Sequence, residues 1–156
     1  MEHDHCHITV GVDGSPDSRA ALAYALRDAV RRGATVEVVA SFAPPDYWVP
    51  LYGPPAIPFD EIQEGVRRDA EGIVHEMIEQ MKDELTQPPP VIVRAVAGGA
   101  AQALLQAAEN ADLLVVGSRG HGGFTSMLLG SVSLSCALHS ACPVTVVHST
   151  KQAKNE

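Results

Sequence analysis

The chain has 156 residues, of which 46% are hydrophobic and 19% are charged, and its 11 basic and 19 acidic side chains give a formal net charge of −8. This length and composition predict one globular domain, and the acidic balance disfavours nucleic acid and anionic membranes as partners without excluding a small anionic ligand. No apolar run approaches the ~20 residues of a membrane span, the N-terminus lacks the pattern of a signal peptide, and the three cysteines form no CxxC pair, so we expect a cytoplasmic protein.

Five short apolar runs rich in β-branched residues are typical of strands. In chain order they cover residues 7–12, 35–40, 91–95, 112–116 and 143–147, and each is bounded by glycine, proline or polar residues. Their continuous apolar character favours strands that are buried on both faces, as in a parallel sheet.

The first stretch between these runs has the periodicity of an amphipathic helix. Ser15 is the predicted N-cap, Pro16 and Asp17 suit the first turn, and Gly33 follows the last turn. The apolar face of this helix is expected to hold Leu22, Ala25, Leu26, Ala29 and Val30.

Three further helices are predicted. Over residues 60–85, apolar side chains that include Met77 and Met81 recur with the helical period until the prolines at 88–90 forbid continuation, and these methionines are expected in the core. Residues 101–108 and 131–141 carry the third and fourth helices. The alternation predicts an α/β fold, a single-domain, open five-stranded parallel sheet of Rossmann-like type with helices on both faces.

Ligands of such sheets bind outside the carboxyl ends of the strands, so the loops that follow strands are candidate sites. Residues 11–15 follow the first strand, and residues 117–133 follow the fourth. The loop at 41–59 holds six of the 11 prolines and five of the seven aromatic residues. It is a lid, a partner surface or a proline-stiffened loop that packs its own aromatic side chains.

The glycine-rich segment at 117–133 has the composition of a phosphate site. Five glycines between 117 and 130 let backbone N–H groups approach a ligand, and Ser131 begins a helix whose free N–H groups favour an anion. Ser131 and Ser133 add hydroxyl donors, while Arg119 and His121 add donors that can be cationic. The alternative is a connection whose glycines only permit turns.

Two familiar phosphate-binding motifs are missing from the sequence. No lysine follows a glycine, so there is no GxxxxGK[ST] loop, and residues 11–15 and 117–123 do not complete a GxGxxG fingerprint. A P-loop NTPase and an ordinary dehydrogenase are therefore disfavoured.

Nearly the whole chain resembles the universal stress proteins, from VGVDGS at 10–15 through ADLLVVGSRG at 111–120 to CPVTVV at 142–147. The ATP-binding branch of that family carries G-x2-G-x9-G-[ST], which Gly117, Gly120, Gly130 and Ser131 match. The resemblance implies an adenine nucleotide alpha hydrolase-like fold. It also divides the chain into an N-terminal extension at 1–6, a universal stress protein domain at 7–148 and a C-terminal tail at 149–156.

The same resemblance implies an ATP site with Mg²⁺ or Mn²⁺ as a companion of the nucleotide. It places Asp13 beside the nucleotide and Ala40 at the adenine, with residues 117–120 at ribose and phosphate and residues 130–133 at the phosphate tail. Asp13 has an alternative role as the carboxylate of an Asx turn before Ser15. The implied nucleotide-binding residues are Gly11, Val12, Asp13, Ala40, Val116, Gly117, Ser118, Arg119, Gly120, His121, Gly122, Gly123, Gly130, Ser131, Val132 and Ser133.

A nucleotide-responsive regulator of stress responses is the function that the resemblance implies. It also implies a homodimer that pairs through Val144–Val147, which would cover an exposed edge strand. The sequence offers no obvious lysine or paired carboxylates for phosphoryl transfer, which favours binding over turnover. Slow ATP hydrolysis or autophosphorylation, a preference for cyclic AMP or another adenine nucleotide, and a purely structural role are the alternatives.

Other metal-capable and nucleophilic side chains are given no role. His3, His5, Cys6 and His7 form a terminal cluster that we expect to be adventitious rather than a dedicated metal site. Cys136 and Cys142 are expected to pack as small apolar side chains.

Overall fold

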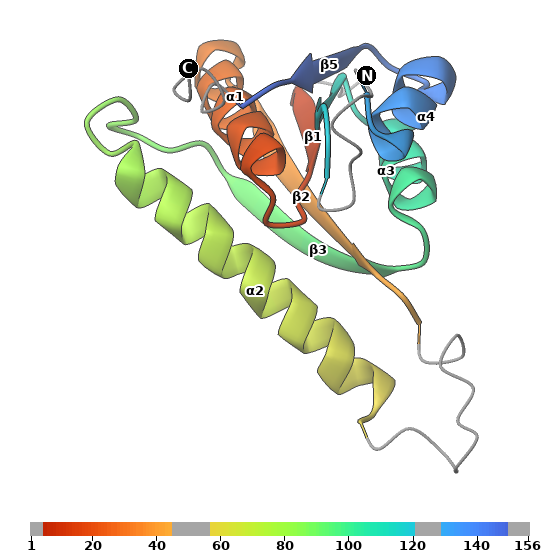
Figure 1. Cartoon of the computed structure of the whole chain (residues 1–156). Helices are drawn as coiled ribbons and strands as arrows, with labels where there is room; N and C mark the ends of the chain where they lie inside the picture. The colour runs from red at the N-terminus through yellow and green to blue at the C-terminus, as the bar shows by residue number, and fades with distance from the viewer. Residues whose placement is uncertain (1–4, 45–56, 121–128, 150–156) are drawn as a thin grey trace, which may run out of the picture.

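The computed structural model describes residues 5–44, 57–120 and 129–149, and in it a parallel sheet lies between two layers of helices (Figure 1). The strands are β1 (His7–Gly11), β2 (Thr35–Phe42), β3 (Val91–Ala97), β4 (Leu113–Gly117) and β5 (Val144–Val147). They lie in the order β3-β2-β1-β4-β5. The predicted open five-stranded sheet is therefore confirmed.

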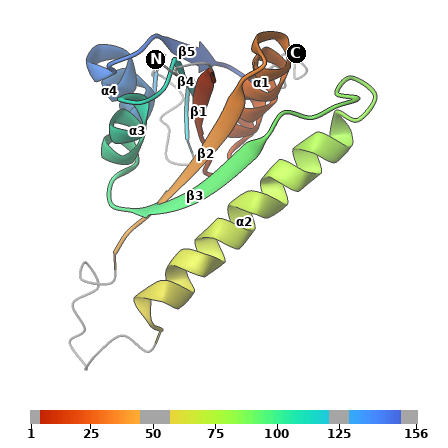
Figure 2. The same cartoon turned by 180° about the vertical axis from the view of Figure 1, so that it is seen from behind.

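The helices are α1 (Pro16–Arg32), α2 (Phe59–Gln80), α3 (Ala100–Ala108) and α4 (Ser131–His139). Helices α1 and α2 cover one face of the sheet and α3 and α4 cover the other, as the two opposite views show (Figures 1 and 2). The strand order reverses at β1, since β2 lies on one side of it and β4 on the other. The loops after β1 and β4 therefore meet at the switch point where α/β sheets bind ligands.

Alternation along the strands divides the described core between the two faces of the sheet. On the α1 and α2 side, Ile8 and Val10 pack with Leu22 and Leu26, and all four are fully buried. On the α3 and α4 side, a smaller cluster joins strand residues to Leu104 of α3 and Cys136 of α4. Burial raises the pKa of the Cys136 thiol to about 11, and this cysteine packs as the sequence predicts.

The predicted ends of α1 are confirmed. The Ser15 side chain accepts a hydrogen bond from the Ser18 amide, Pro16 is the first helical residue, and Gly33 takes the left-handed conformation at φ 65°. The prediction that Val30 belongs to the buried apolar face is wrong, because this residue is 46% exposed. It lies near the C-terminal end of the helix, next to Ala29, which is fully buried.

The predicted lengths of α2 and α4 are wrong at their C-terminal ends. Helix α2 stops at Gln80 rather than residue 85, and a tight turn follows in which the Leu85 amide donates to the Met81 carbonyl. Met81 and Leu85 remain buried, so the apolar period continues after the helix has ended. Helix α4 stops at His139, before an extended Ser140.

The two outer strands do not fit the expectation of strands buried on both faces. Residues of β5 are all half-buried, and β3 alternates between more and less exposed side chains, with Ile92 51% exposed. Strands β1, β2 and β4 have neighbours on both sides. A continuous apolar run therefore predicts that a segment is a strand of the sheet, but it does not distinguish an edge strand from a central one.

Some expectations fall wholly or partly outside the described residues. These include most of the 41–59 loop and His3 of the terminal cluster. Within the ranges that are described, no three His, Cys, Asp or Glu side chains are grouped as a metal ion requires. No helix among those same residues is long and apolar enough to cross a bilayer.

Candidate functional site

The loop after β1 is organised around the carboxylate of Asp13. Its Oδ1 accepts hydrogen bonds from the Ser15 amide at 2.9 Å and from the Ser15 hydroxyl at 2.5 Å. The Asp13 amide donates to the Ser18 hydroxyl at 3.3 Å. These contacts form the Asx turn that the sequence offers as the alternative role of Asp13, and they fix both the start of α1 and the position of the carboxylate.

The loop after β4 is held to α1 by Asp17. The Ser118 hydroxyl and the Arg119 amide donate to Oδ2 of Asp17 at 2.6 and 3.1 Å, and the Ser149 amide donates to Oδ1 at 2.9 Å. Burial raises the pKa of this carboxyl, but the hydrogen bonds from Ser118, Ser149 and Arg119 outweigh that effect, so the pKa of Asp17 lies below its ordinary value. The sequence predicts only a favourable helix-dipole position for this residue.

The N-terminus of α4 lies against the same loop. The Gly130 amide donates to the Ser118 carbonyl at 2.7 Å, and the Ser133 hydroxyl lies 2.9 Å from that carbonyl. Among the described residues, no side chain caps α4 at its N-terminus, and its first turn contains no acidic residue. The first N–H groups of a helix have no partner within the helix, so those of α4, together with the helix dipole, favour an anion.

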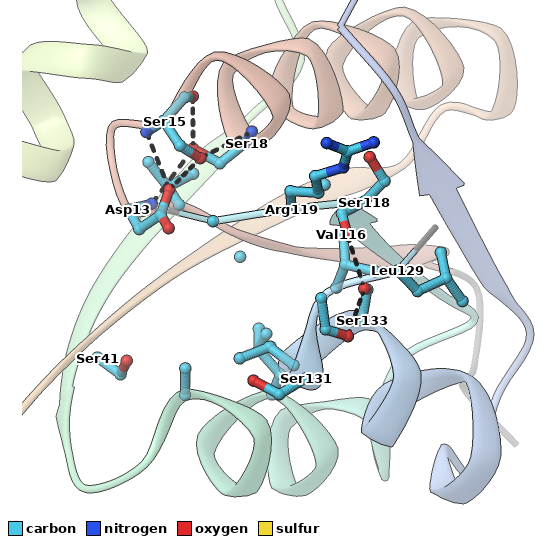
Figure 3. Close-up of a pocket in the computed structure, with 18 of the residues that line it drawn as sticks. Asp13, Ser15, Ser18, Ser41, Val116, Ser118, Arg119, Leu129, Ser131 and Ser133 are labelled. Carbon is cyan, nitrogen blue, oxygen red and sulfur yellow. Dashed lines mark hydrogen bonds between the residues drawn. The ribbon is translucent and has the colours of Figure 1, made fainter. Parts of the chain in front are cut away.

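These three segments, together with residues of β2 and α3, line a cavity of about 420 Å³, which is within the range typical of small-molecule sites. Figure 3 shows Asp13, Ser15 and Ser18 at the start of α1, with Ser41 and Ser131 on the other side of the cavity. The lining consists of Gly11, Val12, Asp13, Ser15, Ser18, Val39, Ser41, Ala100, Leu104, Val116, Gly117, Ser118, Arg119, Gly120, Leu129, Gly130, Ser131, Val132 and Ser133.

Most of the residues that the sequence singles out therefore lie around one cavity. Ala40 is not among the lining residues; its neighbours Val39 and Ser41 are, because side chains alternate along β2. His121, Gly122 and Gly123 lie outside the described residues. The residues implied by the resemblance do not include Ser15, Ser18 and Ser41, which line the cavity, nor an apolar group formed by Val39, Ala100, Leu104 and Leu129. Of these, Ser15 and Leu129 lie within the two candidate loops at 11–15 and 117–133.

Two glycines of the motif lie where an added Cβ would be in close contact with other atoms. A Cβ on Gly117 would lie 2.7 Å from the backbone carbon of Asp17 and 2.8 Å from the Ser18 amide nitrogen. A Cβ on Gly120 would lie 2.8 Å from Oδ2 of Asp13. Gly117 therefore lets β4 approach the start of α1, whereas Gly120 keeps the space beside the Asp13 carboxylate open.

The charge around the cavity differs from that of the chain as a whole. The described lining contains one carboxylate, Asp13, and one guanidinium, Arg119. The sequence has no acidic residue from Leu113 to Asn155, although the whole chain carries a net charge of −8. In Figure 3 the Arg119 side chain extends toward α1, while Ser131 stands at the α4 end of the cavity. The α4 end is thus the part of the cavity suited to an anionic group.

Comparison with known proteins identifies relatives over nearly the full length of the chain. A sequence model of the universal stress protein family matches residues 6–148. The universal stress protein Rv2005c of Mycobacterium tuberculosis is 39% identical over 137 residues, which make up 88% of this chain and 43% of that protein. The chain thus spans less than half the length of this relative.

Solved structures share the fold. A universal stress protein in complex with cAMP is 26% identical, with a TM-score of 0.63, and the match covers 94% of this chain and 99% of that one. An Arabidopsis thaliana protein of the universal stress protein family, with AMP bound, is 19% identical, with a TM-score of 0.55 over 94% of this chain and 93% of its own. At that lower identity the likeness concerns the fold alone.

Proposed function

Because this chain belongs to the universal stress protein family, we propose that it is an adenine-nucleotide-binding regulator of stress responses, with ATP among its ligands. The observation that carries the proposal is the cavity at the switch point, where Asp13 and the N-terminus of α4 face one space. The universal stress protein solved in complex with cAMP, which is 26% identical, supports adenine nucleotides as the ligand class.

The cavity has separate polar and apolar parts that suit the parts of a nucleotide. Residues 130–133 would hold phosphate through the free N–H groups of α4 and the Ser131 hydroxyl. The apolar side chains of Val39, Ala100 and Leu104 would contact the base, and the fixed carboxylate of Asp13 would accept hydrogen bonds from ribose or base. In this assignment, phosphate lies at α4, the base lies against the apolar side chains, and Asp13 contacts ribose or base.

A divalent ion would arrive with the nucleotide rather than occupy a separate protein site. Asp13 is the single carboxylate among the described lining residues, and Mg²⁺ in nucleotide sites is commonly held by one or two carboxylates together with phosphates and water. Because Asp13 is assigned to ribose or base, the donor set fits Mg²⁺ or Mn²⁺ bound chiefly through water and the oxygens of a di- or triphosphate.

Binding rather than turnover is the proposed activity. The described lining contains no lysine and no pair of carboxylates, which are groups that phosphoryl-transfer enzymes use to position the metal and the nucleophile. Titration calorimetry of the purified chain with ATP, AMP and cAMP, with and without Mg²⁺, tests the proposal. Saturable binding of at least one nucleotide is expected, and the absence of binding for all three would overturn it.

Replacing Ser131 by glutamate is expected to weaken nucleotide binding roughly 30-fold, since the added carboxylate would compete with phosphate for the N–H groups of α4 and repel it. A glutamate in the first turn of a helix favours the helix, so the variant should remain folded. Calorimetry gives the affinity, and thermal unfolding checks the fold.

The Gln106→Glu variant is a matched control, because it adds the same charge on an exposed residue of α3 that does not line the cavity. It should bind as the wild type does. Equal losses of affinity in the two variants would assign the effect to net charge and not to an anion site at α4.

We also propose that the chain forms a homodimer through β5. The two edges of the sheet differ, because Gln63 of α2 donates to the Ala95 carbonyl on the outer edge of β3 at 3.0 Å. Strand β5 pairs only with β4 in the described sheet. Beside it, α4 exposes Leu134 and Leu138, at 44% and 68%, one turn apart on the same helix. Among the described residues, the β5 edge thus combines strand backbone without a sheet partner with apolar surface on the neighbouring helix.

The Val146→Pro variant is expected to raise the dissociation constant of such a dimer about 100-fold, because proline removes a strand N–H and obstructs pairing. The Pro143 and Val147 carbonyls accept from β4 and the following loop, so the backbone groups of Val146 face the open edge by alternation. The β4–β5 ladder should survive. Sedimentation equilibrium measures the change.

Val146→Ala is the control, because it shortens the same side chain and keeps the N–H group. It should lower stability slightly while the variant remains dimeric at concentrations where Val146→Pro is monomeric. A wild-type chain that sediments as a monomer at all concentrations would refute pairing through β5.

A further inference from the structure

The carboxylate of Asp17 joins three segments that are far apart in sequence. It lies in the first turn of α1, it accepts hydrogen bonds from Ser118 and Arg119 in the loop after β4, and it accepts one from Ser149, just after β5. Asp17 and Ser149 do not line the cavity, whereas Ser118 and Arg119 do. The carboxylate therefore connects the wall of the site with the end of the edge strand.

A carboxylate suits this position better than a neutral side chain. Two oxygens with several lone pairs accept all three donors, whereas an amide would offer one acceptor oxygen and point its NH₂ group at a donor. The start of α1 also stabilises negative charge through the helix dipole. Close packing of Gly117 against the backbone of Asp17 and Ser18 leaves little room for α1 to move relative to β4.

We propose that Asp17 is a positioning residue that couples the end of β5 to the nucleotide site, so that displacement of the chain after β5 alters nucleotide affinity. This inference rests on the proposed function. The Ser149 amide, at 2.9 Å from Oδ1, and the Arg119 amide, at 3.1 Å from Oδ2, bind opposite oxygens of one rigid group. A shift of the Ser149 amide would rotate the Asp17 carboxylate, and this rotation would move the loop that contains Arg119.

Through these contacts, a movement of β5 would be transmitted to the nucleotide site. Ser118 directly follows β4, and its amide donates to the Val147 carbonyl at the end of β5 at 2.8 Å. The hydroxyl of the same residue donates to Asp17. Events that reposition β5, including association of its open edge, would reach Ser118 and Arg119 through this pair of contacts. By reciprocity, nucleotide binding would reposition the end of β5 by the same coupling free energy.

The test alters the donor and the acceptor of the Ser149–Asp17 hydrogen bond separately. Ser149→Pro deletes the N–H group that binds Asp17, whereas Ser149→Ala retains it. We expect Ser149→Pro and Asp17→Asn to weaken nucleotide binding about tenfold, a size typical of residues that act on a site through a network, and Ser149→Ala to bind as the wild type does. Calorimetry with AMP and with cAMP provides the affinities.

A double-mutant cycle separates coupling from general loss of stability. If Asp17 transmits the effect, Ser149→Pro should cause no further loss of affinity in the Asp17→Asn background. Wild-type affinity in Ser149→Pro, or equal losses in the presence and absence of the Asp17 carboxylate, would overturn the proposal. Urea unfolding of each variant identifies any that lose the fold. If Asp17→Asn does not fold, the comparison of Ser149→Pro with Ser149→Ala still tests the proposal.

A readout without nucleotide distinguishes failure of this inference from failure of the proposed function. Amide hydrogen exchange at Arg119 should accelerate in both Asp17→Asn and Ser149→Pro but not in Ser149→Ala. If the wild type binds no nucleotide while this exchange pattern is seen, the proposed function fails and the coupling stands. Unchanged exchange at Arg119 in Ser149→Pro, with nucleotide binding intact, would refute the coupling alone.

Discussion

The Gly120→Glu variant is expected to bind adenine nucleotides about 100-fold more weakly than the wild type, or not measurably. A Cβ at this position would lie 2.8 Å from Oδ2 of Asp13, and the Asp13 side chain cannot withdraw easily because Ser15 holds its other oxygen with two hydrogen bonds. The glutamate also brings a second negative charge into a cavity that has to accept phosphate, and such like-charge contacts cost several kcal/mol. Calorimetric titration measures the change.

Two controls separate the steric effect from the electrostatic one. Gly120→Ala adds only the Cβ and should weaken binding less than the glutamate does. Gly99→Ala changes a glycine at the start of α3 whose Cβ would meet nothing within 4 Å, and it should leave affinity unchanged. Wild-type affinity in Gly120→Glu would mean that the nucleotide does not occupy this cavity.

The Gly117→Ala variant is expected to lower the free energy of unfolding by about 1–3 kcal/mol, the usual cost of inserting atoms into a well-packed site. The added Cβ would meet backbone atoms of Asp17 and Ser18 at 2.7 and 2.8 Å. Backbone cannot rotate out of the way as a side chain can, so α1 or β4 has to move. Urea denaturation measures the loss, and the slope of the transition shows whether the unfolded surface has changed.

Gly72→Ala is the matched comparison for this variant. Gly72 lies inside α2, is exposed, and its Cβ would meet nothing within 4 Å. Alanine there should raise the free energy of unfolding by about 0.5–1 kcal/mol, because glycine is the poorer helix former. If Gly117→Ala were as stable as Gly72→Ala, the close approach of β4 to α1 would not be what requires glycine at 117.

The contrast between Gly117 and Gly120 illustrates how far a motif can be interpreted from sequence. Both glycines belong to the G-x2-G-x9-G-[ST] pattern, and the resemblance assigns both to ribose and phosphate. The structure gives Gly117 a packing contact with α1 and places Gly120 beside Asp13. Spacing predicts that the positions matter together, but it does not distinguish glycine required by the fold from glycine required by the ligand.

Local interactions explain what could be predicted well. The Ser15 cap, the Pro16 start and the Gly33 stop of α1 depend on residues within a turn of one another, and all three are confirmed. The order of strands and helices follows equally local patterns. The predicted end of α2 is wrong because apolar spacing continues through Met81 and Leu85 after the backbone has left the helix. The predicted end of α4 is wrong because the backbone is already extended at Ser140.

Turn chemistry and side-chain periodicity act over a few residues, so they predict the α/β class, the parallel sheet and the two loops that meet at the candidate site. The contacts of Asp17 could not be predicted in this way. Its partners Ser118 and Ser149 are 101 and 132 residues away in the chain, and they meet it because the sheet places β4 and β5 beside the start of α1. Contacts of that separation depend on strand order and packing, which no local pattern encodes.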